Sequence, residues 1–187
     1  MIRSSISESI RVKQALLDDA AVVERISAAA ALMTDCIRSG HKIMWAGNGG
    51  SAADAQHLAA ELVNKFRLER KGMASIALTT DTSILTSIGN DYGYDRVFAR
   101  QVEALGRKGD ILVGISTSGN SRNLIEAYEA CREAGVASIA MTGESDCRMD
   151  CYDLVIKIPS KETPRIQECQ TLVGHILCEM IEKEIYG

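Results

Sequence analysis

The sequence lacks the features of a membrane protein, a secreted protein or a general nucleic-acid-binding protein. No stretch approaches the length of an apolar membrane span, and residues 1–8 contain no apolar segment typical of a signal peptide. There is no run of basic residues and the net charge is −4, which disfavours general binding to nucleic acid. We therefore expect a cytoplasmic protein with neither a membrane nor a nucleic acid as partner.

Disulfide and zinc-finger patterns are also missing. The six cysteines have no framework spacing, and Cys147 and Cys151, the one close pair, are not followed by a second pair. Without a signal peptide we expect the cysteines to be reduced and buried. With 187 residues, of which 46% are hydrophobic and 25% charged, the composition is typical of one globular domain over residues 1–187.

Five apolar segments alternate with helical patterns along residues 41–187. This alternation predicts an α/β fold, a three-layer α/β/α sandwich around a five-stranded parallel sheet. The expected strands are residues 41–46, 75–78, 110–115, 136–141 and 153–158. The expected helices are residues 52–66, 81–88, 94–105, 121–134 and 164–185.

Residues 1–40 are predicted to form a helical arm before this core. Apolar residues recur at steps of three and four from Ile6 to Ile37, and Gly40 ends the pattern. A break near Asp18 would divide the arm into two helices. Because so long an apolar face cannot all be buried on one small sheet, we expect the arm to pack against another subunit in a homo-oligomer.

Two loops at predicted strand ends have the composition of an anion site. Residues 46–54 (AGNGGSAAD) contain three glycines, and residues 116–121 (STSGNS) contain four hydroxyl side chains. A strand that ends in such a turn at a helix N-terminus presents free N–H groups and the positive end of the helix dipole. The P-loop lysine and the G-x-G-x-x-G motif are absent, so a small phosphate monoester fits better than a nucleotide. The alternative is that these residues serve only as turns and caps.

Polar residues also occupy one face of two predicted helices. His57 and Glu61 lie at i and i+4, opposite an apolar stripe, and Gln167 and His175 lie on the polar side of the last helix. This pattern fits either an exposed helix face or a pocket that binds a metal or moves protons. Gln167 and His175 would lie about 12 Å apart along one straight helix. If both serve one site, either the helix begins after Gln167 or different subunits supply them.

Four ordered motifs resemble the phosphoheptose isomerases, single-domain members of the sugar isomerase (SIS) family. They are Gly47–Glu61, Gly89–Gly93, Gly114–Ser121 and Arg165–Glu168 followed by His175. The resemblance extends over nearly the whole chain. It implies an aldose–ketose isomerase that converts sedoheptulose 7-phosphate to glycero-manno-heptose 7-phosphate, the first step toward the heptose of lipopolysaccharide core or surface glycans. It also implies a homotetramer.

The resemblance further implies roles for individual residues. Glu61 and His175 would be the acid–base pair, and a zinc ion would be bound by His57, Glu61, Gln167 and His175. The substrate would be bound by Asn48, Gly49, Gly50, Glu61, Asn90, Asp91, Ser116, Thr117, Ser118, Ser121 and Gln167. A base and an acid move protons between C1, C2 and their oxygens, whereas a metal would polarise the carbonyl. Tight zinc binding by Glu61 and His175 would compete with their acid–base use.

One position departs from the family pattern, because Gln170 stands where a histidine is usual. We expect a local change in the wall of the site, with metal affinity the property most affected. Two alternatives stay open at this stage. One is a non-enzymatic SIS protein that binds the bacterial replication initiator, which the presence of Glu61 and His175 disfavours. The other is an isomerase of a different sugar phosphate.

Overall fold

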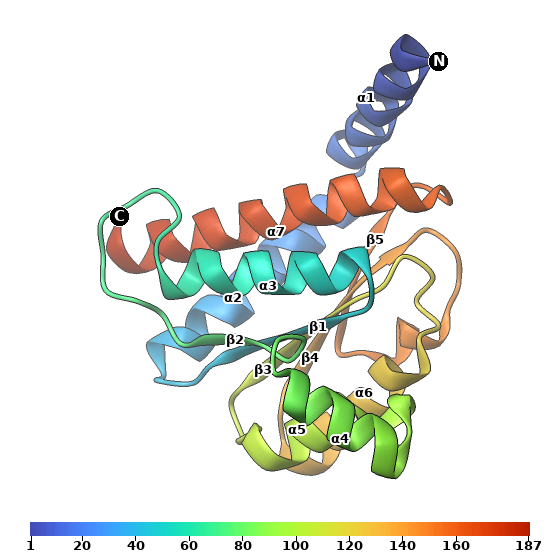
Figure 1. The fold of residues 1–187 in the computed structure, drawn as a ribbon. Helices are drawn as coiled ribbons and strands as arrows, with labels where there is room; N and C mark the ends of the chain where they lie inside the picture. The colour runs from blue at the N-terminus through green and yellow to red at the C-terminus, as the bar shows by residue number, and fades with distance from the viewer.

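The computed structural model describes all 187 residues, and its elements alternate between helices and strands after two N-terminal helices (Figure 1). The strands are β1 (Ile43–Gly47), β2 (Ser75–Ala77), β3 (Ile111–Ile115), β4 (Ala137–Gly143) and β5 (Leu154–Ile158). The α-helices are α1 (Ile2–Asp18), α2 (Ala20–Arg38), α3 (Gly50–Val63), α4 (Thr82–Tyr92), α5 (Ala99–Leu105), α6 (Arg122–Ala134) and α7 (Thr163–Tyr186). Two short 3₁₀ helices are η1 (Tyr94–Arg96) and η2 (Arg148–Cys151).

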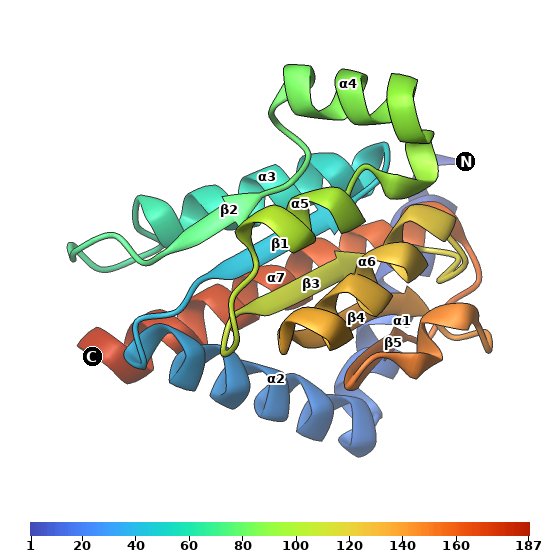
Figure 2. The ribbon, with the colours of Figure 1, turned by 90° about the horizontal axis from the view of Figure 1, so that it is seen from below.

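The five strands form one parallel sheet in the order β2-β1-β3-β4-β5, which confirms the predicted fold class (Figure 2). β1 and β3 are neighbours although β2 lies between them in the chain. The connections after β1 and after β3 therefore leave the sheet in opposite directions. Such a topological switch point opens a crevice at the carboxyl ends of the two strands, where ligands bind in open α/β sheets.

Successive side chains of each strand enter two separate apolar cores, because strand residues alternate between the faces of a sheet. In β1, Ile43 and Trp45 belong to the core shared with α2, α3 and α7. Met44 and Ala46 belong to the core shared with α5 and α6. Helices thus cover both faces of the sheet (Figures 1 and 2). Both faces must be apolar, which is why the strands appear in the sequence as continuous apolar runs.

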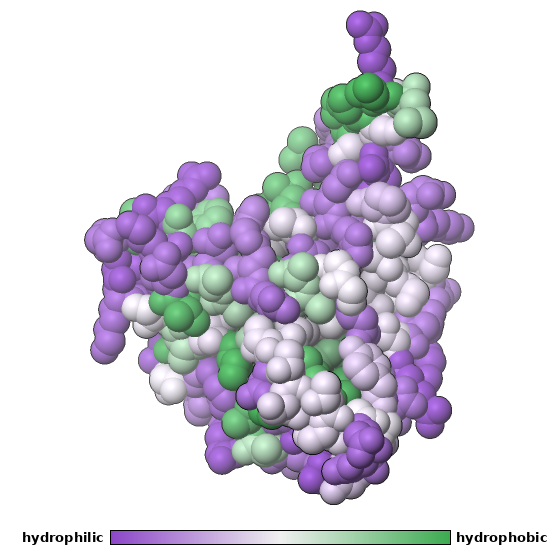
Figure 3. Space-filling view, viewed as in Figure 1, coloured by the Kyte–Doolittle hydropathy of each residue, from purple (hydrophilic) through white to green (hydrophobic).

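The N-terminal arm consists of two helices that meet at Asp19, which confirms the predicted break near Asp18. The Asp19 carboxylate caps α2 by accepting hydrogen bonds from the N–H groups of Ala21 and Val22. α2 packs on the sheet, whereas α1 projects from the body (Figure 1) and buries only Val12 and Leu16. Apolar side chains remain exposed along α1, and they form the green patch at its free end in Figure 3. No helix has both the length and the apolar character needed to cross a membrane.

The predicted helix over residues 94–105 is wrong in one respect, since the structure divides it into η1 and α5. Gly93, at φ +85°, ends α4, and a single 3₁₀ turn follows. The two adjacent residues Val97 and Phe98 are then both buried in the core beneath α5 and α6.

Two buried carboxylates, Asp110 and Glu182, join neighbouring segments of the chain. Asp110, at the amino end of β3, accepts hydrogen bonds from the backbone N–H groups of Lys42 and Arg107 and pairs with the Lys42 ammonium. Glu182, near the end of α7, pairs with Arg70 at 2.8 Å, and the two side chains are 2% and 1% exposed. Burial alone would raise the pKa of Glu182. Hydrogen bonds from backbone N–H groups and from Arg70 outweigh it, and the pKa is lowered.

We predict that Glu182→Gln lowers the free energy of unfolding by about 3–5 kcal/mol at neutral pH, because it leaves the buried Arg70 charge uncompensated. Because the folded-state pKa of Glu182 lies below its unfolded value, the ion pair contributes fully to the free energy of unfolding above the unfolded pKa of about 4.3. This contribution is lost as the pH falls through the folded pKa, and the two proteins should converge in stability there. Denaturant titrations at neutral and acidic pH measure this.

Glu129→Gln is the matched control, since Glu129 forms an exposed ion pair with Arg132 on α6. Its effect should stay below about 1 kcal/mol. A stability difference between wild type and Glu182→Gln that is the same at all pH values would contradict the prediction.

Candidate active site

Two loops meet at the carboxyl ends of β1 and β3. The glycine loop between β1 and α3 contains Asn48, and the serine loop between β3 and α6 ends at Ser121, the N-cap of α6. The side-chain amides of Asn48 and Asn123 exchange two hydrogen bonds, of 3.0 and 2.8 Å. Asn123 is 3% exposed, so this amide pair fixes one loop against the other. The two predicted ligand loops therefore border one crevice.

The serine loop gathers hydroxyl groups around one point. The Ser116 hydroxyl lies 3.2 Å from that of Ser121 and 3.5 Å from that of Ser118, and it also accepts a hydrogen bond from the N–H of Gly119. The Ser121 side chain makes no capping hydrogen bond, and its partner is the Ser116 hydroxyl. Hydroxyl donors at the N-terminus of a helix form an anion site. Thr117 lines an adjoining polar cavity of about 310 Å³ together with Lys161.

The helices α3 and α7 run side by side in the same direction (Figure 1). Three contacts join their polar faces, each about one helical turn after the last: Gln167 against Gly50, Thr171 with Asp54, and His175 with His57. The Thr171 hydroxyl donates to the Asp54 carboxylate at 2.8 Å. We call this row of contacts the polar seam.

At the end of the polar seam, His57, Glu61 and His175 form a cluster of titratable groups. The Nε2 atoms of the two histidines are 2.7 Å apart, and His57 Nε2 lies 3.4 Å from a Glu61 carboxylate oxygen. Side-chain exposure is 47% for His57 and 23% for Glu61, so both are accessible to a ligand. The Phe66 ring packs against the His175 imidazole with centroids 5.5 Å apart. A carboxylate and an imidazole are thus available together for acid–base chemistry.

The donor set of this cluster fits a zinc ion. One nitrogen from each histidine and one Glu61 oxygen all lie within 4.8 Å of one another. Zinc takes imidazole and carboxylate ligands, and two ligands at tetrahedral zinc lie about 3.3 Å apart. The distance between His57 and Glu61 matches this value, whereas the two histidine nitrogens would need to separate by about 0.6 Å.

Gln167 does not join this cluster within one chain. α7 begins at Thr163, so the alternative in which the helix begins after Gln167 is wrong. The Gln167 side chain instead lies against Gly50, where an added Cβ would be 2.6 Å from Nε2. A Gln167 ligand to the same metal would have to come from another subunit, and it stays a prediction. In its own chain, Gln167 lies next to the glycine loop, and its contact with substrate stays a prediction.

Asn90 and Asp91 lie in the last turns of α4, apart from the polar seam. Asn90 donates a hydrogen bond of 2.7 Å to Asp91, and Asp91 lines a cavity of about 360 Å³ between α4 and α5. α4 buries none of its own residues in this chain. The predicted contact of both residues with substrate is not tested by this geometry.

Gln170, the position that departs from the family pattern, is fully buried behind the serine loop. Its Nε2 donates to the Met141 carbonyl at 2.8 Å, and the same carbonyl accepts the Ser116 N–H at 3.0 Å. Its Oε1 has no hydrogen-bond partner. Gln170 therefore lies behind the serine loop and does not line the wall of the site, and its effect on metal affinity stays a prediction.

The contacts of Asn123 and Thr171 were not predicted from the sequence, which places Thr171 only on the polar face of the last helix. Their partners are 75 and 117 residues away, so no local spacing reveals these contacts. Asp54 belongs to the glycine-loop motif, but its partner was not foreseen. All six cysteines are free, as expected, but only four are buried, since Cys147 is half-buried and Cys151 is exposed. Burial raises the pKa of Cys131 and Cys178 to about 12.

Comparison with known proteins agrees with this geometry. The model of the SIS domain matches residues 10–143. The phosphoheptose isomerase of Aneurinibacillus thermoaerophilus is 51% identical, with 99% of this chain and 94% of that protein covered. Phosphoheptose isomerase 2 of Campylobacter jejuni is also 51% identical, with 100% and 93% covered. The solved phosphoheptose isomerase of Neisseria gonorrhoeae is 47% identical with a TM-score of 0.91, and 97% of each chain is covered.

The match of the SIS domain model to residues 10–143, more than half of the chain, shows that this parallel-sheet protein belongs to the SIS domain family. Within that family it belongs with the phosphoheptose isomerases, which it matches over its full length. It is therefore an aldose–ketose isomerase, and the non-enzymatic alternative is set aside.

We predict that Gly50→Ala raises the KM for substrate about two- to tenfold, since displacing Gln167 removes a contact worth about 0.5–1.5 kcal/mol. The new Cβ would meet the flexible end of Gln167, so the fold should tolerate it. If the effect acts through Gln167, the double variant Gly50→Ala/Gln167→Ala should match Gln167→Ala alone in steady-state kinetics. Additive effects of the two substitutions would refute this route.

Proposed function

We propose that this enzyme interconverts sedoheptulose 7-phosphate and D-glycero-D-manno-heptose 7-phosphate, the first step toward the heptose of lipopolysaccharide core or surface glycans. Full-length similarity to phosphoheptose isomerases supports the substrate class. The observation that supports the chemistry best is the cluster of His57, Glu61 and His175 at the end of the polar seam. The serine loop, at the other end of the crevice, would bind the phosphate.

The phosphate is assigned to Ser116, Ser118 and Ser121, whose hydroxyls face one another within 3.2 to 3.5 Å of Ser116. The dipole of α6 adds favourable charge at this point. Backbone N–H groups of the glycine loop and the Gln167 amide would orient the sugar hydroxyls. The reacting carbons C1 and C2 would then lie toward Glu61 and His175, because the phosphate is at the opposite end of a seven-carbon chain.

Glu61 and His175 are assigned the proton transfers. In the direction from ketose to aldose, a carboxylate removes a proton from C1 while an acid donates a proton to the C2 oxygen, which gives an enediol. Return of a proton to C2 and loss of the proton on the C1 oxygen complete the aldose. The same pair serves the reverse reaction, since acid and base exchange roles. His57 would keep His175 oriented through the contact between their Nε2 atoms.

We further propose that His57, Glu61 and His175 bind a zinc ion, with Gln167 of a second subunit as a fourth ligand. A bound zinc would polarise the substrate carbonyl and favour the enediol. The oxygen and nitrogen donors support this assignment, and no thiolate lies among them.

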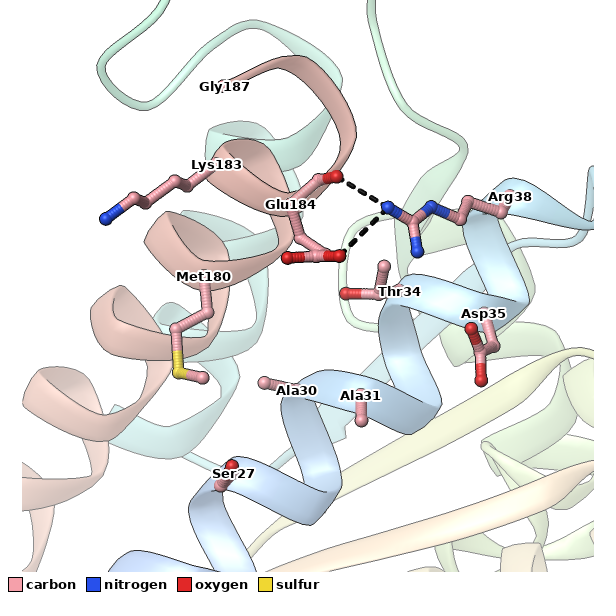
Figure 4. A pocket seen from close by; sticks show the side chains of 10 residues that line it. All are labelled: Ser27, Ala30, Ala31, Thr34, Asp35, Arg38, Met180, Lys183, Glu184 and Gly187. Carbon is pink, nitrogen blue, oxygen red and sulfur yellow. Dashed lines mark hydrogen bonds and ion pairs between the residues drawn. The ribbon is translucent and has the colours of Figure 1, made fainter.

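A homotetramer is the proposed assembly. α1 exposes Ile2, Ile6, Ile10 and Leu17 along its length, which favours packing against other copies. A groove of about 540 Å³ between α2 and α7 is a second candidate contact surface (Figure 4). Small side chains such as Ala30 and Ala31 line its floor, and Arg38 bonds to Glu184 at one end. The groove contains none of the proposed catalytic residues.

We predict that Glu61→Gln and His175→Gln each lower kcat about 100- to 10,000-fold, the usual contribution of a positioned acid or base. Both side chains are accessible and lie on the polar seam, so the melting temperature should change little. Turnover of sedoheptulose 7-phosphate, followed by the appearance of the aldose, measures this. Turnover within tenfold of wild type for either variant would refute that residue's role.

We predict that mixed oligomers identify which subunit supplies each residue. Glu61→Gln and His175→Gln should not complement each other, because both residues lie in one chain's cluster. Glu61→Gln mixed with Gln167→Ala should give a higher kcat than the two proteins assayed before mixing, since about a quarter of the sites in a random mixture would receive both intact residues. The KM of these sites should stay raised, because the chain that supplies Glu61 still carries Gln167→Ala. The measurement is turnover after the two variants are unfolded and refolded together. Lack of recovery would place Gln167 in the same chain's site, and a monomer in light scattering would contradict the assembly.

A further inference from the structure

The most extensively hydrogen-bonded ion pair in the molecule lies about two turns beyond the polar seam along α7. The Glu182 carboxylate accepts hydrogen bonds from the backbone N–H groups of Phe66, Arg67 and Leu68, at 2.7 to 3.0 Å, and from Arg70 Nε at 2.8 Å. These donors belong to the loop that follows α3, whereas Glu182 belongs to α7. The ion pair therefore fixes the end of one helix to the other.

Arg70 uses the rest of its guanidinium group to cap α3. Nη2 donates to the Glu61 carbonyl at 2.9 Å, and Nη1 donates to the carbonyls of Leu62, Asn64 and Lys71 at 2.9 to 3.3 Å. Carbonyls in the last turn of a helix have no partner within the helix. A cation at this end also interacts favourably with the helix dipole. One of the capped residues, Glu61, is the proposed base.

The same ion pair reaches the proposed acid through Phe66. The Phe66 N–H donates to Glu182 at 3.0 Å, which fixes the backbone of Phe66. The Phe66 ring packs on the His175 imidazole. A single buried pair thus contacts the main chain of Glu61 and, through one aromatic ring, the side chain of His175.

We propose that Arg70 and Glu182 are positioning residues for the isomerase reaction, which hold Glu61 and His175 at their working separation. A buried ion pair often contributes no more stability than apolar residues of the same size. Its directional hydrogen bonds, however, specify one arrangement of α3 against α7, whereas apolar packing would allow small shifts along the helices. The proposal rests on the proposed roles of Glu61 and His175.

The test compares Glu182→Gln with Asp110→Asn. Asp110 is also a buried carboxylate bound by backbone N–H groups and a cation, but it lies at the amino end of β3, away from the crevice. Both substitutions should lower the melting temperature. Only Glu182→Gln should lower kcat, by about 10- to 100-fold. It should also reduce the affinity for Zn²⁺ by a similar factor, because loss of a residue that supports metal ligands weakens metal binding to this extent. Zn²⁺ affinity is measured by competition with a chromophoric chelator.

Further variants separate positioning from stability. KM should stay within about twofold of wild type in Glu182→Gln, because the serine loop is untouched. Arg70→Lys retains the charge but not the planar fork, so its kcat should fall between those of wild type and Glu182→Gln. Phe66→Leu retains the ion pair and removes the ring from His175. Because the ring supports His175, Phe66→Leu should lower kcat and Zn²⁺ affinity about threefold or more. If Glu182→Gln does not fold, Phe66→Leu alone tests the positioning role.

Equal loss of activity per folded molecule in Glu182→Gln and Asp110→Asn would overturn the proposal, as would wild-type kinetics in Phe66→Leu. Glu61→Gln and His175→Gln, assayed in parallel, separate the two levels of argument. If they retain turnover, the proposed catalytic roles fail. If they abolish turnover while Glu182→Gln and Phe66→Leu do not lower it, only the positioning role fails.

Discussion

The parallel packing of α3 against α7 is the contact on which the rest of the site depends. Its apolar side brings Leu58 against Gly174, where an added Cβ would lie 2.4 Å from a Leu58 methyl group. The missing side chain lets the two backbones approach closely. On the polar side, the three contacts of the polar seam recur once per turn. A slip of one turn, about 5.4 Å, would break all of them and separate the titratable cluster.

The sheet supplies the second constraint, since it sets where the serine loop lies relative to that cluster. β1 leads into the glycine loop and α3, and its neighbour β3 leads into the serine loop. The Asn48–Asn123 amide pair joins the two loops across the switch point. The fold therefore fixes the position of the serine loop relative to the glycine loop and α3.

The sequence predicts the sheet and the ligand loops because both depend on local patterns. Apolar runs bounded by helical periodicity indicate buried parallel strands, and glycine or serine clusters mark the turns after them. Contacts between distant residues leave no such pattern. Arg70 is one of several arginines in the chain, and only folding brings it against Glu182, 112 residues away. Likewise, the local pattern around Val97 and Phe98 does not show that the helix predicted over residues 94–105 is divided into η1 and α5.

The separation of His57 and His175 connects the chemistry to the scaffold. Their Nε2 atoms, 2.7 Å apart, can share a proton, whereas two ligands of one zinc ion lie about 3.3 Å apart. The separation of the two nitrogens differs by about 0.6 Å between the two arrangements, so the spacing of α3 and α7 must be held to a similar tolerance. Packing of Leu58 on Gly174 limits their approach, and the Arg70–Glu182 pair limits their sliding. The site therefore needs a buried ion pair at the end of α3 for geometric reasons, even where stability alone would not require one.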